Sequence, residues 1–175
     1  MSSVTKRQNT VKAREDQHTP AGALLTDLII PTIQLEAHFS RAGEAIAATG
    51  GQTLARWLTL EMVAGEPATV ARVARRLGLS RQSVQRIADL LETDGLTEYV
   101  ENPAHQTSKL VRLTARGRQS LRLIQSAQRA WANSLGARIG EANLRQASRV
   151  VEQLTQLLTD DSTSGGRAAR AGVAR

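Results

Sequence analysis

The sequence contains no cysteine, and aromatic residues make up only 2% of its 175 residues. The missing cysteine excludes disulfides, thiolate metal clusters and cysteine redox switches. The scarcity of aromatics predicts an aliphatic core and leaves few platforms on which single-stranded bases could stack. The chain is still long enough to bury an ordinary core without covalent staples.

Long apolar runs are missing as well. The first ten residues lack the apolar stretch of a signal peptide. The longest apolar region near them, 24–33, is interrupted by Asp27 and Pro31 and is too short to span a bilayer. We therefore expect a soluble, cytoplasmic protein that makes no membrane contact.

The sequence also lacks the residue patterns of known catalytic and metal sites. Its three histidines, His18, His38 and His105, form no H-x-x-x-H pair, and neither G-x-x-x-x-G-K-[ST] nor G-x-S-x-G occurs. Glycines stand instead where predicted helices end. We expect no enzymatic activity, no cofactor and no metal.

Positive charge is in excess, with 23 Lys and Arg against 16 Asp and Glu and a net charge of +7. Such a surplus favours association with nucleic acid or an anionic surface, although it says nothing about the fold.

The stretch 67–92 predicts two short helices joined by a tight turn. Gly78 stands where the first helix would end and Ser80 where a hydroxyl could cap the second. Apolar residues of helical spacing give each helix one buried face: Val70, Val73, Ala74 and Leu77, then Val84, Ile87, Ala88 and Leu91. This arrangement is typical of a helix-turn-helix, which can place its second helix in the DNA major groove. An ordinary helical hairpin with a solvated face is the alternative.

Two strand candidates, 96–100 and 109–113, follow the second helix. The connection between them is polar and contains Asn102-Pro103, a turn signal. A helix-turn-helix followed by a β-hairpin is the winged-helix arrangement, in which the wing gives a second contact with the duplex. This order of elements disfavours the plain helical hairpin.

Helical patterns flank this lobe on both sides. The first, 21–49, contains Pro31, which should kink the helix or mark the first turn of its main segment. Thr114 can cap a long helix towards Arg138. The last helix, 141–158, has a narrow apolar stripe that usually packs on a partner helix: the first helix of the same chain, a second copy, or both. Residues 1–20 and 159–175 read as a disordered arm and tail.

With these elements in order, the sequence resembles the MarR family of bacterial transcriptional regulators. The resemblance spans about residues 21–158. It is carried by A-x-x-L-G-L-S at 74–80, S-V-Q-R at 83–86, L-E-x-x-G-L at 91–96 and the strand-to-helix junction KLVRLTARG at 109–117.

The resemblance implies a mainly α fold with a small β-hairpin. A winged helix-turn-helix DNA-binding lobe (50–114) would stand between an N-terminal dimerisation helix (21–49) and C-terminal dimerisation helices (115–158). It further implies a homodimer on palindromic double-stranded DNA, usually a repressor, which a small aromatic effector often releases. A winged-helix protein-interaction module without specific DNA binding is the alternative.

Candidate base-reading residues lie on the second helix of the motif. Arginine can pair bidentately with guanine and glutamine with adenine. The candidates are Arg81, Gln82, Gln85 and Arg86. Arg86 could equally grip a phosphate, a contact that carries no base information. Ser83 would contact a phosphate or cap the helix locally.

Other candidate DNA contacts lie on the preceding helix and the wing. Arg72 could meet the DNA backbone or simply be solvated. Family wings often carry an arginine at the tip for the minor groove, whereas here residues 105–108 read HQTS. The family's minor-groove role therefore falls to His105 or Lys109, and Arg112 on the wing strand could face either the duplex or water.

Overall fold

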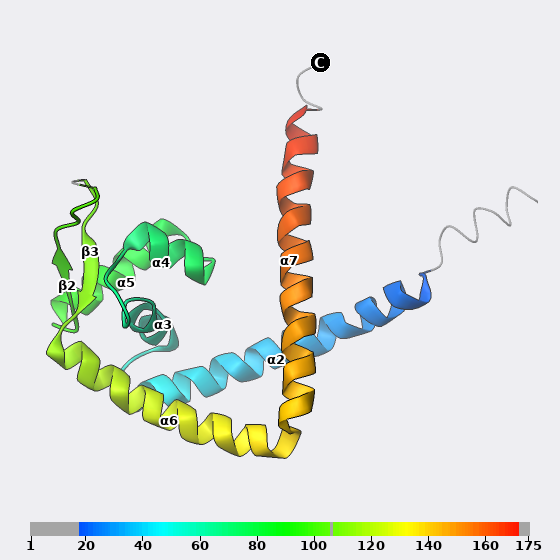
Figure 1. Ribbon diagram of the computed structural model, residues 1–175, viewed down its shortest axis with the longest axis horizontal. Helices are drawn as coiled ribbons and strands as arrows, with labels where there is room; N and C mark the ends of the chain where they lie inside the picture. The colour runs from blue at the N-terminus through cyan, green and yellow to red at the C-terminus, as the bar shows by residue number, and fades with distance from the viewer. Residues whose placement is uncertain (1–17, 106, 172–175) are drawn as a thin grey trace, which may run out of the picture. The chain divides into compact units, whose positions relative to one another are not determined.

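The computed structural model describes residues 18–105 and 107–171 (Figure 1). The chain divides into two compact units, the first ending at Leu121 and the second beginning at Arg122. The first unit contains helices α2 (Pro20–Ala48), α3 (Leu54–Met62), α4 (Val70–Leu77) and α5 (Arg81–Thr93), and strands β1 (Ala68–Thr69), β2 (Thr97–Val100) and β3 (Leu110–Leu113). Helix α6 (Ala115–Ile139) starts in the first unit and continues into the second, which also contains α7 (Glu141–Ala171). The predicted mainly α fold with a small β element is confirmed.

Local capping explains where the two helices of the motif begin and end. Gly78 follows α4 with φ 66°, the left-handed conformation that glycine adopts without steric cost. Ser80 precedes α5, and its Oγ accepts a hydrogen bond from the Ser83 amide at 3.1 Å. The predicted turn and cap are therefore confirmed. The sequence analysis missed the cap of α4, where Thr69 Oγ1 accepts from the Arg72 amide at 3.2 Å.

The wing belongs to a three-stranded antiparallel sheet with the order β1-β3-β2. The predicted hairpin is confirmed, with Thr97 opposite Leu113 and Val100 opposite Leu110. The third strand, β1, was not predicted, because two residues are too short to show an alternating pattern. It pairs Ala68 with Val111 and so ties the start of α4 to the wing.

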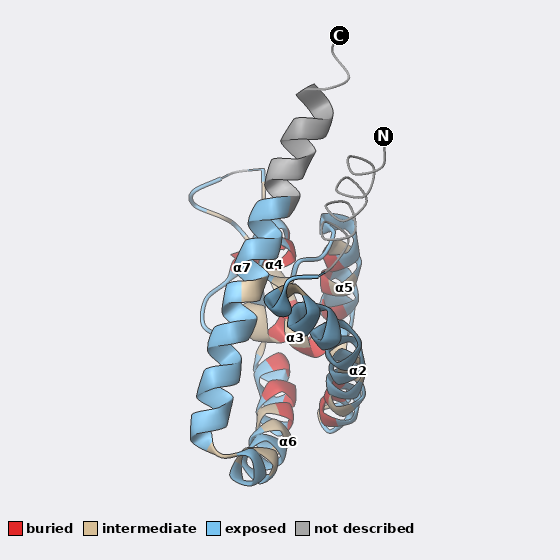
Figure 2. Cartoon of the chain, turned by 90° about the vertical axis from the view of Figure 1, so that its right-hand side faces the viewer, coloured by how far each residue is buried: buried red, intermediate tan, exposed pale blue. Residues whose placement is uncertain are grey.

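An aliphatic core holds the lobe together. Leu60, Val84 and Leu91 are fully buried, and Val73 and Val111 almost so. Helix α5 packs against both α3 and α4 and also contacts β2. Figure 2 shows buried residues on α3, α4 and α5, whereas almost every residue from 141 to 161 of α7 is exposed.

Two helices differ from the prediction. Helix α2 begins at Pro20 behind the cap Thr19 and runs through Pro31, which therefore does not mark a first turn. Helix α7 continues to Ala171, where a tail was expected from residue 159. No proline interrupts this segment. Residues 1–17 of the expected arm and 172–175 of the expected tail lie outside the described residues. None of the described helices has the length and apolarity needed to cross a membrane.

Candidate nucleic-acid interface

The outer face of α5 carries the predicted polar side chains. The helix turns Val84, Ala88 and Leu91 into the core. This leaves Arg81, Gln82, Ser83 and Arg86 exposed and Gln85 half-buried. Arg81, Gln82, Gln85 and Arg86 line a shallow hollow of about 650 Å³ together with Asp89, Leu90 and Thr93. The structure therefore brings the four base-reading candidates together on one open surface.

Positive charge on this surface is not neutralised by neighbours. Neither Arg81 nor Arg86 makes an ion pair with any residue that the structure describes, and Arg75 and Arg76 in the last turn of α4 are likewise exposed and unpaired there. Unpaired guanidinium groups keep their full charge and their hydrogen-bond donors for an anionic partner.

A cleft of about 390 Å³ separates the start of α4 and α5 from the wing. Arg81 and Lys109 supply its cationic groups. The other lining residues are Thr69, Val70, Ala71, Gln85, Tyr99, Thr107 and Ser108. Two cations and several hydroxyl groups around one opening match the chemistry with which proteins hold DNA phosphates. The sequence analysis missed Thr69, although a threonine just before an apolar helical pattern is itself a helix-start signal.

A hydrogen-bonded triad joins α5 to the wing. Gln85 Nε2 donates to Asp89 Oδ1 and to the Tyr99 hydroxyl, both at 2.8 Å, and the Tyr99 hydroxyl donates to Asp89 Oδ1 at 2.7 Å. Burial, followed by the hydrogen bond to Asp89, raises the pKa of Tyr99 well above its ordinary value. The tyrosine therefore stays protonated and acts as a donor. Tyr99 lies within the strand candidate 96–100, and nothing local in the sequence indicates its partners.

The remaining predicted site residues lie outside the cleft, and each already takes part in an ion pair or a hydrogen bond. Arg72 pairs with Glu66. Arg112 pairs with Glu98 at 3.1 Å, directly across the β2–β3 register. Ser83 Oγ lies 2.7 Å from Ser80 Oγ, which fits the local capping alternative. His105 is exposed in the wing turn, where its amide donates to the Asn102 carbonyl at 3.1 Å.

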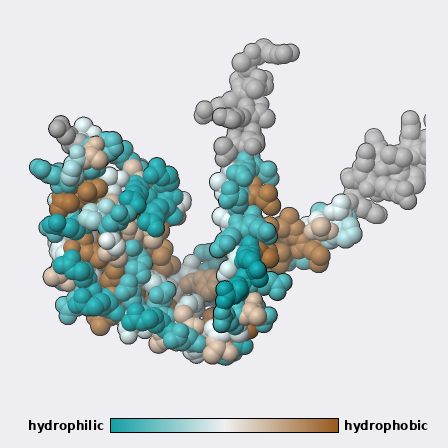
Figure 3. Space-filling view, in the orientation of Figure 1, coloured by the Kyte–Doolittle hydropathy of each residue, from teal (hydrophilic) through white to brown (hydrophobic). Residues whose placement is uncertain are grey.

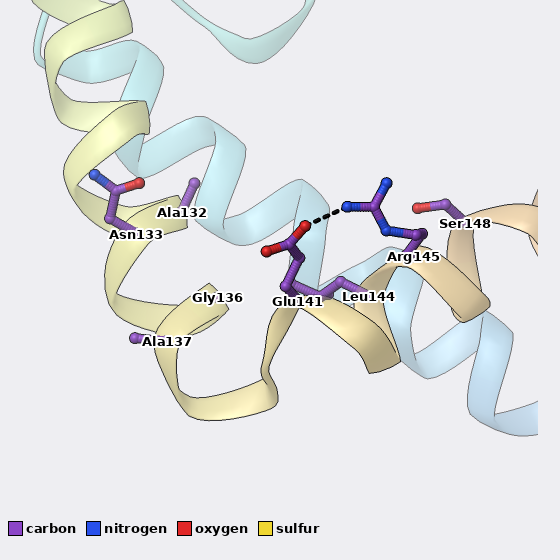
Figure 4. A pocket seen from close by; sticks show the side chains of 8 residues that line it. All are labelled: Ala132, Asn133, Gly136, Ala137, Glu141, Leu144, Arg145 and Ser148. Atoms are coloured by element: carbon purple, nitrogen blue, oxygen red, sulfur yellow. Dashed lines mark hydrogen bonds and ion pairs between the residues drawn. The ribbon is translucent and has the colours of Figure 1, made fainter.

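The second unit contains a hollow of its own, of about 630 Å³, where α6 meets α7 (Figure 4). Small side chains on α6, among them Ala132, Gly136 and Ala137, form one wall. The two charged residues that line it, Glu141 and Arg145, are paired with each other. Its lining thus offers no unpaired charge to a ligand.

Comparison with known proteins agrees with this geometry. Residues 51–106 match the MarR family. An uncharacterised protein of Mycobacterium tuberculosis (strain H37Rv) is 44% identical over 97 residues, which cover 55% of this chain and 68% of the relative. A second uncharacterised protein, from Mycobacterium bovis, matches to the same extent.

Solved structures share the fold, terminal helices included. The crystal structure of a MarR family transcription regulator has a TM-score of 0.70 and 24% identity, covering 82% of this chain and 98% of its own. Staphylococcus aureus MarR in complex with salicylate and kanamycin has a TM-score of 0.70 and 15% identity, covering 79% and 95%. The M. tuberculosis regulator MosR in complex with DNA has a TM-score of 0.59 and 22% identity, covering 74% and 96%.

The helix-turn-helix, the wing and these matches agree with one another, and they identify a protein that regulates transcription and is not an enzyme. The chain belongs to the MarR family of winged helix-turn-helix, DNA-binding transcriptional regulators.

Proposed function

We propose that the chain is a repressor that binds a palindromic operator as a homodimer, with α5 of each copy in the major groove. The observation that carries this proposal is the outer face of α5, where Arg81 and Arg86 are exposed and unpaired among the described residues and Gln82 lies beside them. Guanidinium and amide groups on an exposed helix are the side chains that read base edges.

The proposed DNA contacts divide into contacts with base edges and contacts with phosphates. Gln82, Gln85 and Arg86 are assigned to base edges. Arg81 and Lys109, which share the cleft beside the wing, are assigned to phosphates. Arg72 and Arg112 would contact the backbone only by giving up or sharing their carboxylate partners, Glu66 and Glu98. His105 and Ser83 are assigned smaller roles, at the wing tip and in local capping.

The exposed apolar surface of α2 supports the dimer. Six large apolar side chains between residues 24 and 33 are between 46% and 68% exposed: Leu24, Leu25, Leu28, Ile29, Ile30 and Ile33. Figure 3 shows this surface in brown near the N-terminal end of α2. A helix that is apolar on several sides is normally buried. On α7, Val151 and Leu158 are 61% and 68% exposed. A second copy that covers both helices would bury these side chains and make 21–49 and 115–158 the dimerisation region.

Release by a small aromatic effector is part of the proposal. The support comes from the similarly folded S. aureus MarR, whose structure holds salicylate. A dimer bound at a promoter would repress it, because it would compete with the transcription machinery for the same duplex.

Duplex binding measured against salt concentration tests the proposal. We expect the purified protein to shift a fragment from upstream of its own gene, with log affinity falling steeply as log salt rises, since each neutralised phosphate contributes about −0.9 to the slope. Absence of a shift at low salt with protein well above micromolar concentration would contradict it. Addition of salicylate as a probe should weaken the shift if aromatic effectors act on this chain.

A further inference from the structure

The triad of Gln85, Asp89 and Tyr99 restricts the rotation of the Gln85 side-chain amide. The three contacting atoms, Gln85 Nε2, Asp89 Oδ1 and the Tyr99 hydroxyl oxygen, are separated by 2.8, 2.8 and 2.7 Å. Two of the residues come from α5 and the third from β2. The triad is thus a contact between the helix assigned to the major groove and the wing.

The arrangement of hydrogens in the triad follows from donor and acceptor chemistry. An ionised carboxylate only accepts, so Asp89 must receive the single hydrogen of the Tyr99 hydroxyl. The phenol oxygen is then left as an acceptor. Gln85 must therefore turn its nitrogen towards both partners. The reversed amide would place Oε1 against a carboxylate oxygen, with two acceptors in contact and no hydrogen between them.

An amide without such partners can rotate and offer a base either a donor or an acceptor. Gln85 lines both the hollow along α5 and the cleft beside the wing, so part of its side chain faces the surface assigned to DNA. Asp89 and Tyr99 accept both N–H groups of Nε2, so the carbonyl oxygen alone is left for DNA, as an acceptor with a fixed direction. An acceptor of fixed direction favours a base that presents an amino donor there, adenine or cytosine, and so discriminates between base pairs.

We infer that Tyr99 and Asp89 are positioning residues that set the base preference of Gln85, so that a residue of the wing helps to determine what α5 reads. This inference rests on the proposed function, in which Gln85 faces a base edge. Tyr99 itself need not touch DNA.

Selection from a library of random duplexes, carried out in parallel with the full-length wild type and variants, tests the inference. Gln85→Ala identifies the base position that Gln85 reads. Tyr99→Phe removes only the phenol oxygen, and Asp89→Ala removes the other partner. Thr97→Val is the matched control, because Thr97 lies on the same strand and its buried Oγ1 has no hydrogen-bond partner among the described residues.

We expect Tyr99→Phe and Asp89→Ala to weaken the base preference at the Gln85 position by about fivefold or more, the factor that corresponds to the lower end of 1–3 kcal/mol. The other positions of the motif should be unchanged, and Thr97→Val should select the wild-type motif. A merely structural role of Tyr99 would lower affinity for all sites together and leave the base preferences intact.

Two results would overturn the inference without touching the proposed function. In the first, the Tyr99→Phe and Asp89→Ala variants select the wild-type motif, whereas the Gln85→Ala variant changes the base preference at one position of it. The other is a Gln85→Ala variant that alters no position, since Tyr99 would then have nothing to position. Failure of the wild type to enrich any motif would instead contradict the proposed function itself.

Discussion

Arg86 and Gln82 lie one helical turn apart on the exposed side of α5, while Val84 and Ala88 lie in the core on its other side. This division follows directly from the period of the helix and was readable from the sequence. Which of the polar side chains form ion pairs could not be predicted from the sequence. Arg72, Arg112 and Arg86 look alike in the sequence, yet the first two pair with carboxylates and Arg86 has no such partner among the described residues. Only the fold brings Glu66 and Glu98 next to their arginines.

Two substitutions of Arg86 separate the base and phosphate alternatives. If Arg86 pairs bidentately with guanine, Arg86→Lys should lose specific affinity by about 1–3 kcal/mol while retaining the charge and the salt slope. If Arg86 only grips a phosphate, Arg86→Lys should bind almost as well as the wild type, and Arg86→Ala should reduce the salt slope by about 1. Fluorescence anisotropy with a labelled operator over a range of salt concentrations distinguishes the two. Arg129→Ala, which removes an exposed arginine of α6, controls for net charge.

Because of Tyr99, we expect the stability of the folded lobe to depend on pH in the alkaline range. Its pKa is raised in the folded state, so the folded protein holds this proton more tightly than the unfolded chain does. The resulting stability is complete below the ordinary tyrosine pKa of 10.0 and is lost as the pH rises through the raised value. Near neutral pH we expect Tyr99→Phe to cost about 1 kcal/mol, the usual worth of a hydrogen bond. The difference from the wild type in urea unfolding should shrink above pH 10. A constant difference across this range would contradict the assignment.

At the scale of elements, the sequence predicted the parts that have a local signal. The two apolar stripes, Gly78 and Ser80 placed the helix-turn-helix correctly, and the polar Asn102-Pro103 connection marked the hairpin. The third strand could not be predicted, because Ala68 and Thr69 become a strand only by pairing with β3. The Gln85–Asp89 pair has the four-residue spacing of a helix face, whereas its closure by Tyr99 depends on how β2 packs against α5.

The start of α6 is fixed by a contact that only glycine permits. Thr114 Oγ1 accepts a hydrogen bond from the Gly117 amide at 3.1 Å, as expected for the predicted cap. A Cβ on Gly117 would lie 2.0 Å from the Leu96 carbonyl oxygen, a backbone atom that cannot rotate away. The junction between wing and α6 therefore depends on this residue.

We expect Gly117→Ala to lower the free energy of unfolding by about 1–3 kcal/mol or more, the usual cost of overpacking. Gly136→Ala, on the same helix, is the control. Its Cβ would meet only Leu144, at an ordinary 3.7 Å, and alanine is the better helix former by about 1 kcal/mol. Urea unfolding followed by circular dichroism measures both. Equal stability of the two variants would show that the Leu96 contact is not rigid.

At the scale of the whole molecule, the exposed apolar side chains of α2 support the proposed dimer. The lobe has its own core, but residues 24–33 contribute six large apolar side chains to no core within the described chain. The sequence analysis left open whether the terminal helices pair within a chain or between copies. Their exposure favours pairing between copies.

A single charge on this surface tests the dimer. Ile30 is 62% exposed, and Ile30→Glu would bury a carboxylate in the proposed interface. We expect the dimer dissociation constant to rise by about 100-fold or more, since an unpaired buried charge costs several kcal/mol. Leu79→Glu, which places the same charge at an exposed leucine outside α2, should leave the oligomeric state unchanged. Analytical ultracentrifugation reads out both variants. A dimeric Ile30→Glu variant, or a monomeric wild type, would contradict the proposed interface.

The central claim is that two copies of α5, held by one dimer, read one duplex. The most direct measurement is the motif that the full-length wild-type protein enriches from random duplex DNA. The account predicts two half-sites related by twofold symmetry, with centres one helical turn apart, about 10–10.5 base pairs or 34–36 Å. Enrichment of a single unrepeated half-site, or of no sequence at all, would contradict it.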